Sequence, residues 1–169
     1  LSDSVITCAA PSKAFNLAGL FTSHIIVSDE GIRKKIQDRK SRIGILRPNL
    51  LGMKACELAY TRASTWLDQC VAKIFQNSQY MKEYVEQNLP ALKLDRLEGS
   101  YLMWMDLNGL GLGYEELDER LMRDARIFFD AGHYFGEEGR GYQRVNIACP
   151  TEAVADAMER LKELVRTLG

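Results

Sequence analysis

The sequence predicts an α+β protein in which helices pack on a small sheet. Apolar residues recur at three- and four-residue steps over residues 61–89, as in a long amphipathic helix. After Pro90 the apolar pattern changes to the alternation of strands, and strand-like and helical segments share the rest of the chain. The 169 residues, 46% hydrophobic and 27% charged, are sufficient for a sizeable core of this kind.

The first part of the chain contains two short apolar runs and a helical stretch. Residues 5–8 predict a strand that needs neighbours to pair with, and residues 23–27 predict a second, buried strand. A polar, helix-like stretch begins at Asp29 and ends near Arg42, and a second helical pattern follows. The long amphipathic segment comes next, either as one helix or as two helices joined near Asn77.

The part after Pro90 is expected to follow the order strand, strand, helix, strand, strand, helix. Thr151 is a residue type that commonly caps a helix through its side chain, so we expect it at the start of the last helix. The six elements are expected over residues 93–97, 101–107, 114–124, 127–129, 142–148 and 151–168.

Composition and charge exclude several classes of function. The formal net charge of −1 argues against a nucleic-acid partner, because phosphate binding depends on an excess of lysine and arginine. The basic residues between positions 33 and 42 are interpreted as a solvated helix face. No apolar stretch approaches the ~20 residues of a membrane span, so a membrane partner is not expected.

The cysteines and histidines predict neither disulfides nor a metal site. Cys8, Cys56, Cys70 and Cys149 have no paired spacing and lie among apolar neighbours, which favours reduced thiols and a cytoplasmic location. The two histidines are far apart in sequence and lack nearby ligand partners, so no metal is expected.

The best candidate for a reactive side chain is Lys13. It lies in the segment Ala-Pro-Ser-Lys-Ala-Phe-Asn-Leu-Ala-Gly-Leu, between Ser12 and Phe15 and away from any run of charges. A lysine in such surroundings can act as a nucleophile and form a Schiff base with a carbonyl compound. Most lysines beside a serine are solvated surface residues, so this hypothesis depends on a second site.

The second candidate is Arg144, in residues 139–150, which read Gly-Arg-Gly-Tyr-Gln-Arg-Val-Asn-Ile-Ala-Cys-Pro. Strand alternation places Tyr142, Arg144 and Asn146 on one side of the strand, with Val145 on the other. A guanidinium fork on a rigid strand can bind a carboxylate with two parallel hydrogen bonds. Arg144 is therefore a candidate anchor for a substrate carboxylate, although strand arginines commonly only reach solvent.

These two segments resemble the cofactor-lysine motif and the carboxylate-binding arginine strand of fold-type I pyridoxal-phosphate (PLP) enzymes in the class I/II aminotransferase superfamily. In detail they are similar to its cystathionine β-lyase or C–S lyase branch. Residues 98–107 and 131–136 resemble a small-domain strand and the loop before the arginine, so four matches occur in order. The resemblance implies that Lys13 holds PLP, that Ser12 contacts the cofactor, and that Arg144 binds the carboxylate of a small amino-acid substrate.

The resemblance also implies a division of the chain. Residues 1–60 would be a remnant of the large PLP-binding α/β domain, residues 61–90 the connecting helix, and residues 91–169 the C-terminal small α+β domain. On this interpretation the rest of the large domain is missing, and the chain is a fragment that is inactive alone. Its parent would be a cytoplasmic homodimer with active sites at the subunit interface.

The implied reaction is β-elimination from sulfur amino acids, giving a thiol, pyruvate and ammonia. A PLP-dependent aminotransferase and a non-catalytic, aminotransferase-like sensor domain are the alternatives. Two positions depart from the family pattern: many relatives have a phosphate-binding hydroxyl three residues before the lysine and an arginine eight residues after it. This chain has Ala10 and Phe21 there, which puts its phosphate contacts in doubt.

Overall fold

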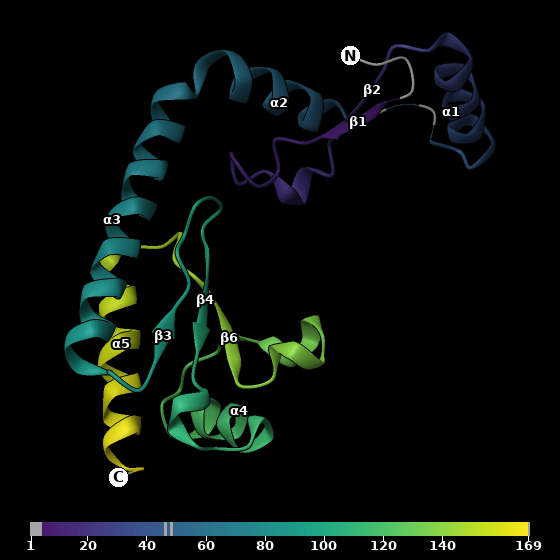
Figure 1. Ribbon diagram of the computed structural model, residues 1–169. Coiled ribbons are helices and arrows are strands. Elements are labelled where there is room, and N and C mark those ends of the chain that lie inside the picture. Colours follow the sequence, from purple (N-terminus) through teal and green to yellow (C-terminus); the bar gives the residue numbers. More distant parts are fainter. Residues whose placement is uncertain (1–4, 46, 48, 169) are drawn as a thin grey trace. The chain divides into compact units, whose positions relative to one another are not determined.

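The computed structural model describes residues 5–45, 47 and 49–168, which belong to two compact units (Figure 1). The first unit comprises Leu1–Gln69 and the second Cys70–Gly169. The helix α3 (Ser64–Asn88) begins in the first unit and ends in the second. Helices and short antiparallel strands make up both units, which confirms the predicted α+β class.

The first unit begins with two paired strands. β1 (Ile6–Ala9) and β2 (His24–Val27) are antiparallel, and Ile6 lies opposite Val27. Between them the chain makes a tight turn and the short 3₁₀ helix η1 (Ala18–Leu20). Both predicted strands are therefore present, each within one residue of its expected position. The expected burial of the second strand is wrong: only Val27 of β2 is buried, and Ile25 and Ile26 are exposed, because β2 pairs with β1 alone in a two-stranded sheet.

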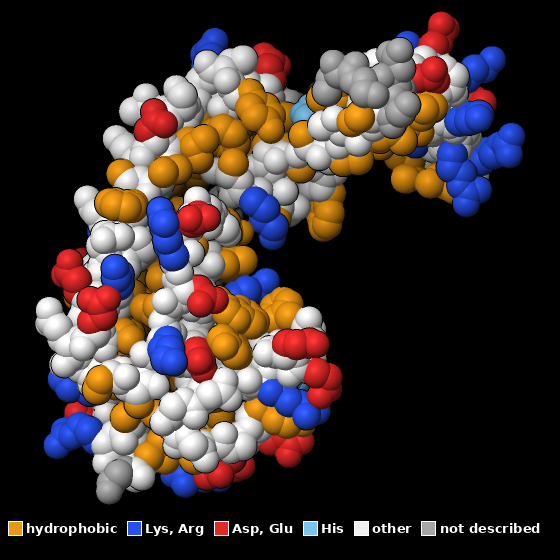
Figure 2. Space-filling model, viewed as in Figure 1, with side chains coloured by type: hydrophobic (Ala, Val, Ile, Leu, Met, Phe, Trp, Pro, Cys, Tyr) orange, Lys and Arg blue, Asp and Glu red, His pale blue; other side chains and the backbone are white. Residues whose placement is uncertain are grey.

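Two helices follow the strands, and each is capped by a polar side chain. Asp29 accepts a hydrogen bond from the Ile32 N–H at the start of α1 (Glu30–Arg42). Asn49 similarly accepts one from Leu51 at the start of α2 (Leu50–Arg62). The basic residues of α1 lie on an exposed helix, as predicted, and Figure 2 shows them gathered over it.

The second unit contains a four-stranded antiparallel sheet in the order β3-β4-β6-β5. The longer strands, β4 (Leu102–Asp106) and β6 (Tyr142–Asn146), form its centre. Its remaining elements are β3 (Lys93–Leu94), β5 (Asp130–Ala131), the helices α4 (Tyr114–Arg123) and α5 (Thr151–Arg166), and the 3₁₀ turns η2 (Asn108–Leu110), η3 (Gly132–Phe135) and η4 (Glu137–Gly139).

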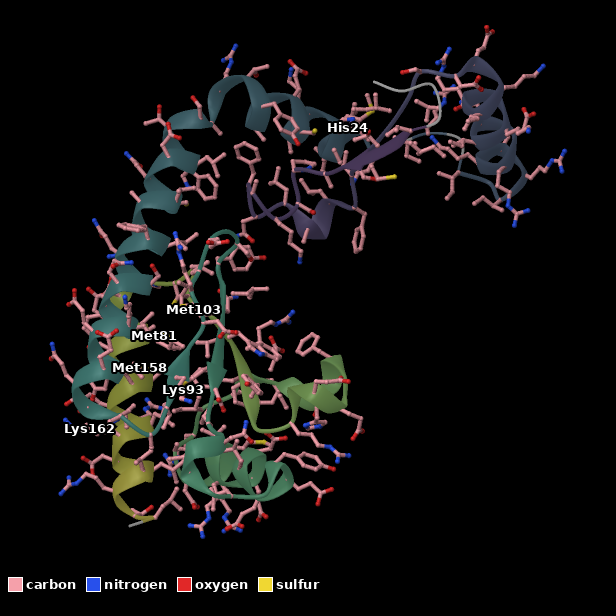
Figure 3. All side chains as sticks on the ribbon, viewed as in Figure 1. His24, Met81, Lys93, Met103, Met158 and Lys162 are labelled. Atoms are coloured by element: carbon pink, nitrogen blue, oxygen red, sulfur yellow. The ribbon has the colours of Figure 1, made fainter. Side chains whose placement is uncertain are left out.

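One face of this sheet is covered by helices and forms the core. Strand alternation directs Met103 and Val145 toward α3 and α5, which lie side by side (Figure 1). Met81 from α3 and Met158 from α5 are fully buried and belong to the same core cluster as Met103 (Figure 3). The opposite face, which carries Arg144, is only half-buried.

A buried amide joins α3 to the chain that leaves β6. Asn77 is fully buried, and its Nδ2 donates to the carbonyls of Ile147 (2.9 Å) and Cys149 (2.8 Å). Its Oδ1 accepts from the Thr151 hydroxyl (2.7 Å). The helix is continuous through Asn77, so of the two expected arrangements the single helix is the one observed.

Two sequence predictions in the second unit are wrong. Thr151 does not cap α5, because its hydroxyl is committed to Asn77 and Pro150 precedes the helix instead. Residues 127–129 are not a strand: the left-handed Arg126 (φ 54°) turns the chain, and the Ile127 N–H bonds back to the Leu121 carbonyl of α4. Pairing with β6 starts only at Asp130.

All four cysteines are free thiols. Burial raises the pKa of the Cys149 thiol above its ordinary value, so the reactive thiolate of this residue is disfavoured. Across residues 5–45, 47 and 49–168, no helix combines the length and apolar character needed to cross a membrane.

Replacing Tyr84 with phenylalanine is expected to stabilise the second unit. The Tyr84 hydroxyl of α3 is buried and makes no hydrogen bond of good geometry among the described residues, although the Glu159 carboxylate lies near it. Removing an unpaired buried hydroxyl should raise the free energy of unfolding by about 1 kcal/mol, measured by urea denaturation. Tyr80→Phe, on the same helix but half-buried, is the control and should change it little; equal effects would contradict this account.

The stabilities of the wild-type chain and Tyr84→Phe should differ more at high pH. Burial, with the nearby Glu159 carboxylate, raises the pKa of Tyr84 in the folded protein. The unfolded phenol loses its proton near pH 10, so the folded wild type becomes progressively less stable above about pH 10. Tyr84→Phe lacks this loss, and its stability advantage should therefore grow with pH.

Candidate functional site

Lys13 lies in a tight turn of the first unit. The Pro11 carbonyl accepts from the Phe15 N–H (2.9 Å), and the turn passes through Asn16 in the left-handed region (φ 53°). Pro11 is buried, whereas Lys13 is exposed, and no ion pair or hydrogen bond engages its Nζ within the described part of the chain. The backbone of this lysine is thus held while its amine is left available.

Aromatic contacts fix the far end of this turn. The Phe15 ring meets Tyr60 of α2 edge-on, with centroids 5.5 Å apart, and lies nearly parallel to Trp66 of α3 at 6.3 Å. Ser12 is half-buried; its carbonyl accepts from the Leu17 N–H (2.9 Å), and its hydroxyl has no hydrogen bond among the described residues. Ser12 and Lys13 therefore present a hydroxyl and an amine from one anchored turn.

A cavity of about 570 Å³ lies beside β2 and α2 in the same unit. His24 (Figure 3) and Cys56 are among its lining residues, and His24 Nε2 lies 3.0 Å from Cys56 Sγ. The thiol therefore gives His24 a close partner that the sequence did not reveal. No group of three metal-ligating side chains occurs in the described residues.

Arg144 lies on β6 in the second unit, between residues of both neighbouring strands. Trp104 of β4 and Asp130 of β5 are its register partners. Oδ2 of Asp130 accepts from Nε (3.1 Å) and Nη2 (2.8 Å) of Arg144, and the Phe135 ring lies 4.5 Å from its Cζ. The predicted alternation of β6 is confirmed: Arg144 is on the half-buried face and Val145 is in the core.

Aromatic rings surround Arg144 on this face. Trp104 stacks on Tyr142 with centroids 5.6 Å apart, and it meets Phe135 edge-on at 5.7 Å. The Arg144 side chain is 33% exposed, so its charge is neither sequestered in the core nor fully solvated. An anion can therefore reach the guanidinium from solvent, while the rings restrict the motion of the Arg144 side chain.

The opposite face of β6 ties the strand to α4. Gln143 is buried and its Nε2 donates to Oδ1 of Asp118 (2.6 Å). Asp118 Oδ2 also lies 3.4 Å from Nδ1 of His133 in η3. The strand is consequently held from the face opposite Arg144, as the support of a two-pronged hydrogen-bond donor requires.

The predicted site residues are divided between the units. Ser12 and Lys13 are neighbours in the first unit, and Arg144 lies in the second. Sequence reasoning missed Asp130 and Phe135 as partners of Arg144. An aspartate directly before the glycine-rich loop, 14 residues upstream of the arginine, is the signal that could have indicated the pair.

Comparison with known proteins relates most of the chain to one family. The family model for aminotransferase class I and II matches residues 2–161. Cystathionine beta-lyase PatB from Bacillus subtilis is 34% identical over 161 residues, 95% of this chain and 42% of its own length. Protein MalY from Escherichia coli is 27% identical, over 93% and 40% of the two chains. The chain thus spans about two fifths of the length of these relatives.

Solved structures give the same result. The structure of cystalysin from Treponema denticola, which contains a pyridoxal 5′-phosphate cofactor, is 37% identical with a TM-score of 0.93, over 99% of this chain and 42% of its own. The PLP-bound C–S lyase from Staphylococcus hominis is 27% identical with a TM-score of 0.83, over 96% and 42%. An aspartate aminotransferase from Pyrococcus horikoshii matches by sequence at 30% identity, over 46% of this chain and 20% of its own.

Proposed function

Because this chain belongs to the aminotransferase class I and II family, we propose that it is the lysine- and arginine-bearing part of a PLP-dependent C–S β-lyase. The whole enzyme would convert a sulfur amino acid and one water molecule to a thiol, pyruvate and ammonia. The observation that carries the proposal is the anchored turn that leaves the Lys13 amine unengaged, in a chain whose lyase relatives match over 95% of its length.

The side chains present suit two of the three recognition tasks that PLP and its substrate require. A free primary amine on Lys13 suits the cofactor's aldehyde, and a strand-held guanidinium on Arg144 suits a substrate carboxylate. Phosphate contacts are less complete: Ser12 offers a hydroxyl, but Phe21 is a hydrocarbon that is 94% exposed. The remaining phosphate donors would come from residues outside this chain.

In the proposed mechanism Arg144 binds the substrate α-carboxylate and thereby fixes the α-carbon. When bound, PLP supplies an electron sink for the electron pair left at that carbon. Nζ of Lys13 removes the α-proton as the general base. Ser12, one residue away, would contact the cofactor, and its carbonyl, which accepts from the Leu17 N–H, helps to keep the lysine turn in place.

The domain roles, assembly and location belong to the same proposal. Residues 1–60 would be the remnant of the cofactor domain, residues 61–90 the connecting helix and residues 91–169 the small domain. The whole enzyme would be a cytoplasmic homodimer acting on a small amino acid, and this chain would be inactive alone. The continuous α3, which joins the two units, supports the connecting role.

Lys13 labelling tests the proposal on the 169-residue chain. The chain is mixed with PLP and reduced with borohydride, and the modified lysines are mapped by mass spectrometry. We expect Lys13 to be modified several-fold more than Lys34 and Lys35, which are exposed on α1. In the complete protein, Lys13→Ala should lower pyruvate formation from cystathionine by about 10³-fold or more. Uniform labelling together with an active Lys13→Ala enzyme would refute the role of Lys13.

An aminotransferase is the second candidate, favoured by the match to an aspartate aminotransferase. Lys13 and Arg144 would serve both reactions, because each begins with carboxylate binding and removal of the α-proton. The two are separated by one observation on the complete protein. Pyruvate and ammonia formed without a keto-acid acceptor indicate a lyase, whereas turnover that needs the acceptor indicates amino transfer.

A further inference from the structure

We propose that Asp130 and Phe135 are positioning residues that leave a single edge of the Arg144 guanidinium for the substrate carboxylate. This inference rests on the proposed function and adds the direction from which the carboxylate is bound. It concerns residues of the second unit alone.

Asp130 occupies the side edge of the guanidinium. Its Oδ2 accepts from both Nε (3.1 Å) and Nη2 (2.8 Å) of Arg144, and the β5–β6 register places the two residues directly opposite one another. Arginine has five N–H donors in a planar fork. Asp130 takes two of them, so the end edge, formed by Nη1 and the second N–H of Nη2, has no partner among the described residues.

Phe135 restricts the guanidinium in the other direction. Its ring covers one planar face of Arg144 at 4.5 Å, which is cation–π distance. Trp104 holds Phe135 edge-on at 5.7 Å and is itself stacked on Tyr142. With one face and one edge covered, the end edge is the part of the fork that can make two parallel hydrogen bonds to a carboxylate.

Asp130 has two opposing effects on anion binding. Its negative charge reduces the attraction of Arg144 for a second carboxylate, whereas its hydrogen bonds fix the direction of the fork. The two side chains are 33% and 45% exposed, so water screens the charge effect. Orientation therefore dominates, and removing Asp130 should weaken carboxylate binding rather than strengthen it.

The test uses the 169-residue chain and the Nε–Hε NMR signal of Arg144, with sodium acetate as the carboxylate probe. Acetate should shift this signal with saturation, whereas acetamide and sodium chloride at the same ionic strength should not. In Asp130→Ala we expect about tenfold weaker acetate binding and at least tenfold faster exchange of the Hε proton with water. Asp130→Asn keeps a hydrogen-bond acceptor, so it should recover part of the acetate affinity and part of the protection of the Hε proton from exchange.

The matched control is Asp156→Ala, which removes another aspartate–arginine pair, with Arg160 on α5. It should leave the Arg144 signal and acetate binding unchanged. Phe135→Leu provides a second test that does not alter charge, and it should also weaken acetate binding. Spectra of all variants must retain the dispersion of the wild-type chain.

Equal acetate binding by wild type, Asp130→Ala and Phe135→Leu would overturn the inference, as would tighter binding by Asp130→Ala. No acetate response at Arg144 in the wild-type chain would overturn it as well. In the complete protein, Asp130→Ala should raise KM about tenfold with kcat nearly unchanged. Lys13→Ala tests the lyase proposal separately. The inference about Asp130 and Phe135 can therefore fail while the lyase proposal stands, and the lyase proposal can fail while that inference stands.

Discussion

Replacing Asn77 with aspartate is expected to destabilise the second unit by on the order of 4 kcal/mol. The two side chains have nearly the same shape, but aspartate has no N–H to donate. The carbonyls of Ile147 and Cys149 would each lose the hydrogen bond that Asn77 Nδ2 donates, and they would face a carboxylate oxygen instead. Because Asn77 is fully buried, water cannot compensate, and a loss of this size is a large fraction of the 5–15 kcal/mol that stabilises a typical domain.

The measurement is urea denaturation followed by circular dichroism, with Asn88→Asp as the control on the same helix. Asn88 is half-buried; its amide donates to the Tyr84 carbonyl (3.0 Å), and its Oδ1 accepts from Nζ of Lys162 (2.9 Å). Aspartate there loses one hydrogen bond and gains attraction to Lys162, so we expect a change below about 1 kcal/mol. Similar losses for both variants would contradict the role assigned to Asn77.

Replacing Gly139 with alanine is expected to destabilise the same unit by about 2–4 kcal/mol and to disturb Arg144. A Cβ at Gly139 would overlap the Gly132 carbonyl oxygen, and a Cβ at Gly132 would overlap the Gly139 carbonyl oxygen. These glycines hold η3 and η4 against each other. Since η3 directly follows β5, which contains Asp130, and ends at Phe135, separating the two turns would displace both partners of Arg144.

Gly99→Ala is the matched control, because a Cβ there meets nothing within 4 Å and its φ is not positive. It should leave stability unchanged or raise it slightly. Denaturation gives the stability of both variants, and the Nε–Hε signal of Arg144 reports the site. A Gly139→Ala chain with wild-type stability and an unchanged Arg144 signal would show that the two turns can separate at no cost.

Strong local patterns in the sequence predicted most of the fold. The 3.6-residue periodicity of α3 and the alternation of β6 were sufficient, because each pattern matches the face that the element buries. Prediction failed where a distant partner decided the outcome. The Thr151 hydroxyl had a local use as a helix cap but bonds to Asn77, 74 residues away, and residues 127–129 are apolar without pairing as a strand.

The candidate site was predictable only as far as its motifs extend. Lys13, Ser12 and Arg144 were identified from local sequence and family resemblance, and that resemblance is confirmed by the family match over residues 2–161. The roles of these three residues stay predictions. Asp130 and Phe135 could not be identified in this way, because their contacts with Arg144 depend on strand register and on two 3₁₀ turns.

The three hydrogen bonds of Asn77 also limit where the molecule can bend. They connect α3 to the chain that follows β6 and to the start of α5. A bend in α3 at Asn77 would break these buried hydrogen bonds, each of which is costly to leave unmade away from water.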